Sequence, residues 1–327
     1  MMGLANIATG LIYQLPMPIE PMKVLAVVAI AQRWSPSMIY ASGLAMGAIW
    51  LLFGLTGVMS WIARITPLSI TRGIQISLGA LLAIEAVKLI LPGWWLGIIA
   101  VVIVIVLRNN RYAPAAIVLI ALGIILMAFR GELTDLKGVE LTLPHLVEIR
   151  LEDIWPSMLQ AGFAQIPLTA TNAVIATSVL IKKYWPERPV SENRLALNMG
   201  VMNLLFPFFG GMPLCHGAGG LVGQYYFGAR TGGTNIIEGL IEISMGLFLA
   251  GSIASLFSAF PSPIIGAMMF LVGIELMKFA RDMHWNWELV PMAATVAVSL
   301  IVNMAFGFLA GMIIHYLFQG VDRLRRR

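Results

Sequence analysis

Long stretches without any charged residue are the feature that most limits how this chain can fold. Asp, Glu, Lys and Arg are absent from residues 34–63, 157–181, 195–229, 243–274 and 289–321. Each stretch supplies the ~20 apolar residues that cross the hydrocarbon core of a bilayer as a helix. Charged residues make up 11% of the chain, against roughly 25% in soluble domains. The sequence therefore predicts an all-α polytopic membrane protein.

The other bulk properties exclude several classes of protein. The net charge is +5, but the basic residues gather in short loops and in residues 323–327, which is typical of a cytoplasmic anchor. We therefore expect no nucleic-acid partner. The single cysteine, Cys215, excludes an internal disulfide, and the four histidines lack the spacing of metal ligands. Motifs of hydrolases, phosphate-binding loops and dinucleotide sites are missing, so we expect neither an enzyme nor a metal or other cofactor.

Charges, prolines and glycines divide the sequence into thirteen candidate helical spans. These spans are 2–15, 22–32, 38–62, 68–91, 93–107, 112–129, 157–181, 195–209, 216–228, 236–259, 263–280, 287–305 and 306–320. Residues 130–156 form the one long polar stretch, for which we expect an extramembrane connector with an interfacial helix. The connector separates a first half (1–129) from a second half (157–320), and a basic tail (321–327) follows.

Lysine and arginine predict the orientation of the spans. Alternate loops, counted back from the C-terminal arginines, are basic, whereas the connector and the loops at 92–94 and 258–263 are uncharged or net acidic. Cytoplasmic loops carry the excess of Lys and Arg. We therefore expect a multi-pass protein of the cell membrane with its C-terminus in the cytoplasm. Arg33 is the one basic residue that does not fit this alternation.

Two similar motifs interrupt the hydrophobic pattern, one in each half. Met17-Pro-Ile-Glu-Pro-Met-Lys23 resembles Met212-Pro-Leu-Cys-His-Gly-Ala-Gly-Gly220, and each opens a short apolar helix. The alternation of basic loops lets the two motifs enter from opposite sides of the membrane, which predicts an inverted repeat with a binding site near the bilayer midplane. The second half has one more span before its motif than the first. We therefore expect a further helix ahead of Met1, missing by truncation or a misassigned start codon, and a seven-plus-seven fold.

The chemistry of the two motifs favours a small anion as the ligand. A helix that begins inside a membrane leaves its first N–H groups unpaired, with a partial charge of about +0.5 at that end. Two such helix starts that face each other form a site for an anion. Gly217, Gly219 and Gly220 allow a close approach of the backbone, because they have no side chain. A tetrahedral oxyanion such as molybdate or sulfate offers only acceptors and suits these donors.

Four side chains near the motifs have a functional and a structural interpretation. Lys23 balances the charge of the anion or of Glu20, or it extends to the membrane interface. Glu20 is costly to keep charged in a membrane, and it is a candidate for pairing with Lys23 or for proton coupling. His216 is a candidate anion donor and proton acceptor, or a residue that satisfies local backbone groups. Cys215 is interpreted as a small packing residue.

A second group of polar residues lies inside predicted spans. Gln165, Thr169, Thr171 and Asn172 recur at helical spacing, and they either donate to the central site or join helices by hydrogen bonds. Gln75 has the same two interpretations. The predicted substrate site consists of Glu20, Pro21, Met22, Lys23, Gln75, Gln165, Thr169, Thr171, Asn172, Cys215, His216, Gly217, Ala218, Gly219 and Gly220.

At these motifs the chain resembles the molybdate transporter family, a branch of the sulfate permease (SulP) superfamily. The resemblance rests on the segments 16–23, 72–75, 165–172 and 211–233, of which Cys215 to Gly220 is the most specific. It implies core and gate domains, with the substrate held between the third and tenth helices, here the spans after Pro21 and Cys215. It also implies a homodimer.

Together the motifs and the resemblance predict a secondary active transporter that imports molybdate by alternating access. The expected partners are the oxyanion, the lipid bilayer and a coupling proton. Glu20 and His216 are the candidate carriers of that proton. Sulfate is the alternative substrate, and an anion channel is the alternative mechanism.

Overall fold

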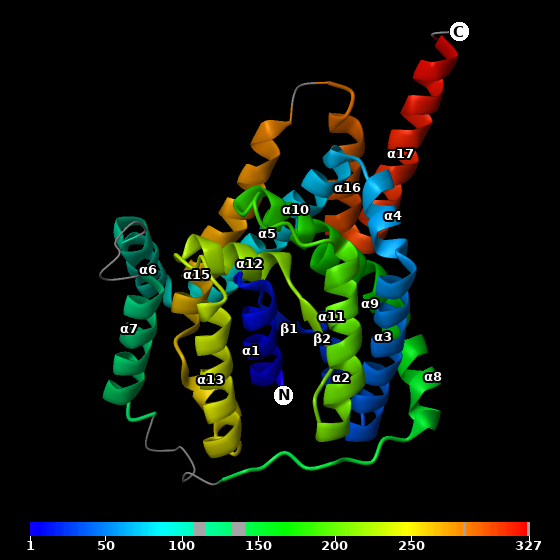
Figure 1. The fold of residues 1–327 in the computed structure, drawn as a ribbon. Coiled ribbons are helices and arrows are strands. Elements are labelled where there is room, and N and C mark those ends of the chain that lie inside the picture. Colours follow the sequence, from blue (N-terminus) through cyan, green and yellow to red (C-terminus); the bar gives the residue numbers. More distant parts are fainter. Residues whose placement is uncertain (108–114, 133–140, 284–285, 326–327) are drawn as a thin grey trace.

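A computed structural model of the chain describes residues 1–107, 115–132, 141–283 and 286–325, and most of these residues are helical. The helices are α1 (Met2–Tyr13), α2 (Lys23–Ala31), α3 (Pro36–Thr56), α4 (Val58–Ile65), α5 (Leu68–Ile90), α6 (Trp94–Leu107), α7 (Ala115–Phe129), α8 (Ile154–Ser157), α9 (Phe163–Leu168), α10 (Thr177–Tyr184), α11 (Glu192–Leu205), α12 (Ala218–Tyr226), α13 (Gly233–Phe248), α14 (Ile253–Ala259), α15 (Ser262–Met277), α16 (Leu289–Ile301) and α17 (Met304–Arg325). Two three-residue strands, β1 (Ile19–Pro21) and β2 (Leu214–His216), lie between the helices near the centre (Figure 1).

Short helical segments of other types extend several of these helices. The 3-10 segments are η1 (Leu91–Gly93), η2 (Leu151–Asp153), η5 (Phe206–Phe209) and η6 (Lys278–Asp282). The π segments are η3 (Met158–Gly162) and η4 (Thr169–Ala176), which lie on either side of α9. Pro167 lies inside α9, and a proline removes a donor and clashes with the preceding turn. The wider π turns accommodate that proline in one continuous run of helix.

Each of the thirteen predicted spans contains a helix. Two of them are broken: the span 38–62 divides at Gly57, which has φ 77°, and the span 236–259 bends by 120° between α13 and α14. Among the described residues, four helical stretches are long and apolar enough to cross a membrane, namely 36–56, 68–107, 151–184 and 262–282, or five if α13 and α14 form one span. The seven-plus-seven count therefore stays a prediction.

Close contacts between small residues hold several helix pairs together. Gly3 and Gly239 face each other's carbonyl oxygens where α1 crosses α13, and Gly10 and Gly232 do the same one step along the pair. Added Cβ atoms at these positions would overlap the opposing backbone. Small residues let helices in membranes approach closely and gain packing contacts. The glycines therefore fix how α1 and α13 pack.

Helix contacts occur in matching pairs across the two halves. Helix α1 of the first half packs on α13 of the second half, and α11 of the second half packs on α3 of the first half. Likewise α16 packs on α5 as α6 packs on α15, and α17 packs on α16 as α7 packs on α6. The helices α5 and α15 pack on each other through Gly79 and Gly273. Each of these contacts therefore has a counterpart in which the two halves of the sequence trade places.

The contacts also divide the helices into two groups. One group, which we call group A, contains α1 to α4 and α8 to α13, and the other, group B, contains α5 to α7 and α15 to α17. Contacts between the groups run mainly through α12 with α15 and through η4 with α5. In Figure 1, α6 and α7 of group B lie at one side of the molecule, and α3, α8 and α11 of group A lie at the other.

The described part of the connector differs from its prediction. Residues 141–150 contain no helix, and residues 133–140 lie outside the described residues, so the interfacial helix was wrong for 141–150. The backbone there bonds to neighbouring elements: Thr142 N donates to Leu247 O, and Val147 N donates to Phe208 O. These bonds satisfy amides that a helix would otherwise pair. Helical structure resumes at η2, before the predicted start of the second half.

The connector and the C-terminus lie at opposite ends of the molecule. The connector crosses one end of the bundle, and α17 carries the C-terminus away from the opposite end (Figure 1). Helix α17 continues into the predicted basic tail 321–327 and ends at Arg325.

Candidate functional site

The two interrupted motifs meet as a pair of antiparallel strands. Ile19 lies opposite His216, Glu20 opposite Cys215, and Pro21 opposite Leu214. Backbone that is neither helical nor paired is very costly inside a membrane, because no water is available to bond to it. The strand pair solves this for both motifs at once. Residues about two hundred positions apart in the sequence are thereby brought to the centre of the fold (Figure 1).

Buried asparagines hold the first motif in place. Asn235 of α13 accepts a hydrogen bond from Met17 N at 2.8 Å and donates to Met17 O and to Asn6 Oδ1. Asn6 of α1 in turn accepts from Ile19 N at 3.1 Å. Both asparagines are fully buried. Their amides replace the helical bonds that Pro16, Met17 and Pro18 cannot form.

A third asparagine performs the same task for the second motif. Asn203 of α11 donates to Leu214 O and accepts from Leu214 N, both at 2.7 Å. Met22 N, at the end of the first motif, donates to Pro213 O at 2.9 Å. The two motifs are thus bonded to each other and to α11, and their positions are fixed together.

Helices α2 and α12 begin directly after the two strands. The residues at their N-terminal caps, Met22 and Gly217, provide no side-chain hydrogen bond to the helix start. Gln165 of α9 covers part of the first start, because its Oε1 accepts from Val24 N at 2.8 Å. Within the part of the chain that the structure describes, the start of α12 has no such side-chain cap. Its first N–H groups are therefore the more available of the two sets for an anion.

The Glu20 carboxylate lies against the start of α12. Its Oε1 is 2.5 Å from the position that a Cβ of Gly217 would take, and it is closer still to that of Gly220. Lys23 Nζ lies 3.4 Å from Glu20 Oε2. A carboxylate and an ammonium group are therefore both present at the predicted site. Glycine is required at 217 and 220 for the carboxylate to reach this position.

The glycine between these two has a different neighbour. A Cβ on Gly219 would lie 3.5 Å from Leu82 and 3.9 Å from Leu78, both on α5 of group B, which are ordinary contact distances. The start of α12 thus has one face toward Glu20 and another toward group B. Gly219 is a natural internal comparison for Gly217 and Gly220.

His216 and Cys215 of β2 are both buried inside the protein. The side chain of His216 is fully buried, with Nδ1 3.4 Å from Pro18 O and its ring edge-on to Tyr13. Among the described residues its Nε2 has no hydrogen-bond partner. Cys215 is a free, buried thiol. This geometry fits the structural interpretation of both residues better than direct contact with an oxyanion.

The polar residues of α9 and η4 bond mostly within the protein. Gln165 donates from Nε2 to Thr169 Oγ1 at 2.7 Å, and Thr171 donates to the carbonyls of Pro167 and Leu168. Asn172 is the exception, because its Oδ1 is buried and has no partner among the described residues. Gln165 therefore supports the site from behind α2.

Gln75 belongs to an ionic cluster at the far end of α5. Its Oε1 accepts from Arg72 Nη1 at 2.8 Å, and Arg72, which is 4% exposed, also pairs with Asp282 of η6. Lys183 of α10 lies 3.9 Å from the same Asp282 carboxylate. We call Arg72, Lys183 and Asp282 the Asp282 cluster. It joins α10 of group A to η6 of group B.

Aromatic rings cover the same junction. Tyr184 of α10 stacks on Tyr225 of α12 at 3.7 Å and meets Phe279 of η6 edge-on at 5.5 Å. Lys183 Nζ lies 4.4 Å from the centre of the Phe279 ring. The junction therefore combines charge pairs with buried ring contacts between the two groups.

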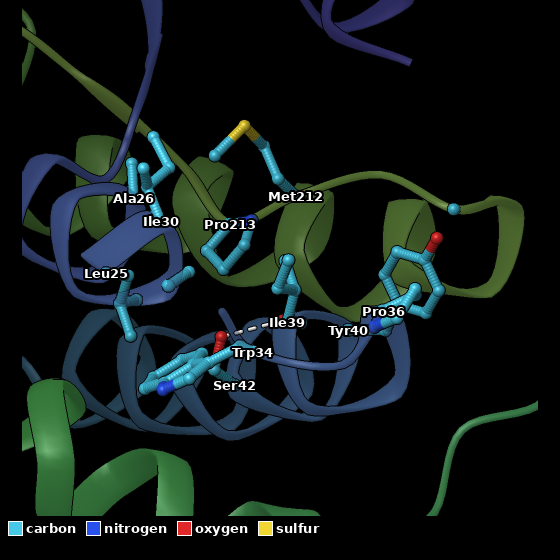
Figure 2. Close-up of a pocket in the computed structure, with 12 residues that line it drawn as sticks. Leu25, Ala26, Ile30, Trp34, Pro36, Ile39, Tyr40, Ser42, Met212 and Pro213 are labelled. Carbon is cyan, nitrogen blue, oxygen red and sulfur yellow. Dashed lines mark hydrogen bonds between the residues drawn. The ribbon is translucent and has the colours of Figure 1, made fainter. Parts of the chain in front are cut away.

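Two cavities lie between the strand pair and the connector end. One of about 560 Å³ is lined by Pro21 and Leu214 of the strands and by connector residues 142–145 and 147. The other, of about 320 Å³, lies among α2, α3 and Met212 (Figure 2). Its lining is almost wholly apolar, and the Ser42 hydroxyl there already donates to Ile39 O. Of these two cavities, the larger one reaches the strands.

No group of three or more His, Cys, Asp or Glu side chains within the described ranges is arranged to hold a metal ion. The charged groups at the strand pair are one carboxylate and one ammonium, and the remaining donors are backbone amides. Such a set is suited to binding an anion rather than a cation.

Comparison with known proteins assigns the family. "Molybdate transporter 2" of Arabidopsis thaliana is 33% identical to this chain, over 97% of this chain and 80% of its own length. "Molybdate transporter 1" of the same plant is 32% identical, over 94% of this chain and 78% of its own length. The family model described as "Molybdate transporter of MFS superfamily" matches residues 1–82 and 157–276. The chain belongs to the molybdate transporter family. The two matched ranges include both strands.

Solved structures show which fold this member of the molybdate transporter family adopts. The transmembrane domain of the cyanobacterial bicarbonate transporter BicA matches with a TM-score of 0.63, 17% identity and coverage of 95% of this chain and 88% of that one. The murine anion transporter Slc26a9 matches with a TM-score of 0.60, 13% identity and coverage of 88% and 53%. The chain therefore has the helical fold of the SulP and SLC26 transporters, and its relatives are named transporters, not enzymes.

Several residues at the site have no clear signal in the sequence. Asn6 lies in α1, Asn203 in α11 and Asn235 in α13, and no motif marks any of the three. Glu238 of α13, which accepts from Gln224 at 2.8 Å, also lies in a predicted span, as does Glu242, which accepts from Asn6 at 3.0 Å. The one feature of these residues that the sequence offered was a polar side chain in an apolar segment, with no obvious partner nearby in the sequence.

Proposed function

We propose that this member of the molybdate transporter family is a secondary active transporter that imports molybdate across the cell membrane by alternating access. One observation carries the proposal: the antiparallel strand pair, which brings the starts of α2 and α12 to one place in the fold. The names of the curated relatives support molybdate as the substrate. Sulfate, which has the same shape and charge, is the alternative.

The strand pair is suited to a tetrahedral oxyanion for a chemical reason. Such an anion carries only acceptors, and a helix start supplies donors without side-chain bulk. Lys23 adds a positive charge next to the α12 start. Backbone amides of 217–220 and 22–24, with Lys23, are the proposed contacts. Gln165, Thr169 and Thr171 hold these elements in place, and Glu20 is the proposed site of proton coupling.

Alternating access is supported by the two groups of helices. Group A carries the strand pair, and group B packs against it through α5 and α15. We propose that group A is the core domain and group B the gate domain. Movement of one against the other would open the site first to the connector side, through the cavity of about 560 Å³, and then to the side of the Asp282 cluster.

The architecture and orientation follow the same reasoning. We propose that 1–129 and 157–320 are the two inverted repeats of a seven-plus-seven fold, joined by 130–156. The connector lies outside and the C-terminus lies in the cytoplasm, because the basic residues collect at that end. A homodimer in the bilayer is proposed from the family resemblance alone.

Uptake by purified protein in liposomes tests the proposal. We expect saturable uptake of radiolabelled molybdate that excess unlabelled molybdate blocks and sulfate blocks more weakly. Lys23→Ala should raise the KM for molybdate about tenfold, since it removes a charge worth roughly 1 kcal/mol or more at a helix start. Lys88→Ala is the matched control, because Lys88 forms the same i,i+3 pair with Glu85 on exposed helix surface.

The alternatives give different results in this assay. Equal and weak inhibition by sulfate and molybdate would overturn the assignment of molybdate. Uptake that rises without saturation would favour an anion channel over a transporter.

A further inference from the structure

The Glu20 carboxylate lies beside the helix start at which the proposed oxyanion would bind. It lies against Gly217 and Gly220, the cap and the first turn of α12, and no side chain caps that helix start. Helix starts attract anions of any kind, carboxylates included. An anionic group of the protein itself is therefore present where the substrate would bind.

The position is specified by the fold and is not an accident of a long side chain. Glu20 is held in β1 opposite Cys215, and Asn6 and Pro213 fix the backbone on both sides of it. Two glycines leave the space that the carboxylate fills. Lys23 is 3.4 Å away and offers the carboxylate a partner beside the helix start.

We propose that Glu20 is a tethered competitor of the transported oxyanion. This rests on the proposed function. In the absence of substrate the carboxylate occupies the start of α12, and it must leave this position or lose its charge before an oxyanion binds. Because the carboxylate returns as the oxyanion departs, Glu20 also promotes release. It sets affinity and turnover without being required as a ligand.

The groups around Glu20 decide what its departure leaves behind. Lys23 faces it from α2, and Cys215 faces it from β2. When the carboxylate leaves the helix start, the positive charge of Lys23 stays beside α2 and is available to the substrate.

Titration of the purified full-length protein with molybdate tests the proposal directly. Glu20→Gln and Glu20→Ala should both bind molybdate about tenfold more tightly than the wild type, since an anion–helix interaction worth ~1–2 kcal/mol no longer opposes binding. The alanine variant separates loss of competition from a new hydrogen bond made by the glutamine amide. Both variants should release substrate more slowly in uptake assays.

Glu238→Gln is the matched control. It removes one negative charge from the neighbouring helix, where the side chain bonds to Gln224 rather than to the start of α12. We expect its affinity to stay within about threefold of the wild type. Thermal unfolding in detergent checks that each variant is folded, and the alanine variant decides the question.

The outcomes separate this proposal from the proposed function. A wild type that binds neither molybdate nor sulfate contradicts the proposed function. A wild type that binds molybdate while Glu20→Ala binds equally or more weakly overturns the tethered competitor and makes Glu20 a ligand or a support for Lys23.

Discussion

Replacing Gly220 by alanine tests whether the start of α12 is the anion site. A Cβ at this position would overlap Glu20 Oε1 and would lie 3.0 Å from Cγ of the buried Pro18. A proline ring held by the fold cannot move far. The methyl group therefore stands in the space that either the carboxylate or an oxyanion oxygen uses.

The size of the effect follows from the interaction that is lost. An anion at a partly buried helix start gains up to ~2 kcal/mol, which corresponds to a roughly 30-fold change in Kd. We expect Gly220→Ala to raise the Kd for molybdate about 10- to 30-fold. Alanine is a better helix former than glycine by about 1 kcal/mol, so weaker binding would not come from a weaker helix.

Gly219→Ala is the control in the same turn of the same helix. Its methyl group would meet only Leu82 and Leu78 of α5 at ordinary distances. It has the same effect on helix propensity, and we expect its Kd to change by less than about threefold. Isothermal titration of both purified variants with molybdate gives the comparison. Unchanged binding by Gly220→Ala, or equal losses in both variants, would refute the placement of the anion at this face.

Two further predictions concern the contacts that hold the site. Asn235→Ala removes three hydrogen bonds to Met17 and Asn6 and leaves buried backbone groups unpaired, so the free energy of unfolding should fall by about 3 kcal/mol in thermal denaturation. Asp282→Asn leaves the guanidinium of buried Arg72 without its carboxylate, and we expect a loss of about 1–3 kcal/mol together with faster exchange between inward- and outward-open states in cross-linking or fluorescence assays.

Each of these predictions has a matched control. Ser244→Ala removes one local bond to Leu240 O on an exposed part of α13, and it should leave the unfolding temperature nearly unchanged. Lys183→Ala removes the longer and exposed partner of Asp282, and we expect less than about 1 kcal/mol. Equal effects of control and test variant would contradict the roles assigned to Asn235 and Arg72.

The sequence alone predicted the helical spans and the pairing of the two motifs. Charge-free stretches locate helices because a bilayer excludes charges, and the Pro and Gly breaks at Met17 and Met212 mark backbone that needs another partner. The breaks inside predicted spans were missed. Gly57 ends α3 with a left-handed conformation, yet it looks in the sequence like any other small residue of a membrane helix.

The contacts within the site could not be predicted in the same way. Asn235 and Met17 are 218 residues apart, and nothing local to either residue specifies the other. Polar residues at 165–172 were correctly expected on helix, but Pro167 and the π turns change the helical phase, so Gln165 bonds to α2 and Thr171 to its own helix. The sequence made Glu20 a candidate functional residue only because a charged carboxylate is costly to keep inside a membrane. Its contact with Gly217 and Gly220 became visible only with the strand pair in place.

The position of bound molybdate tests the central claim most directly. Anomalous scattering from molybdenum in crystals of the protein grown with molybdate locates the ion without assumptions about its ligands. We predict one site beside Gly217 and Gly220, within reach of the backbone amides at 22–24 and of Lys23. An ion bound in the cavity at the connector end, or elsewhere away from both helix starts, in protein that transports molybdate would contradict this account.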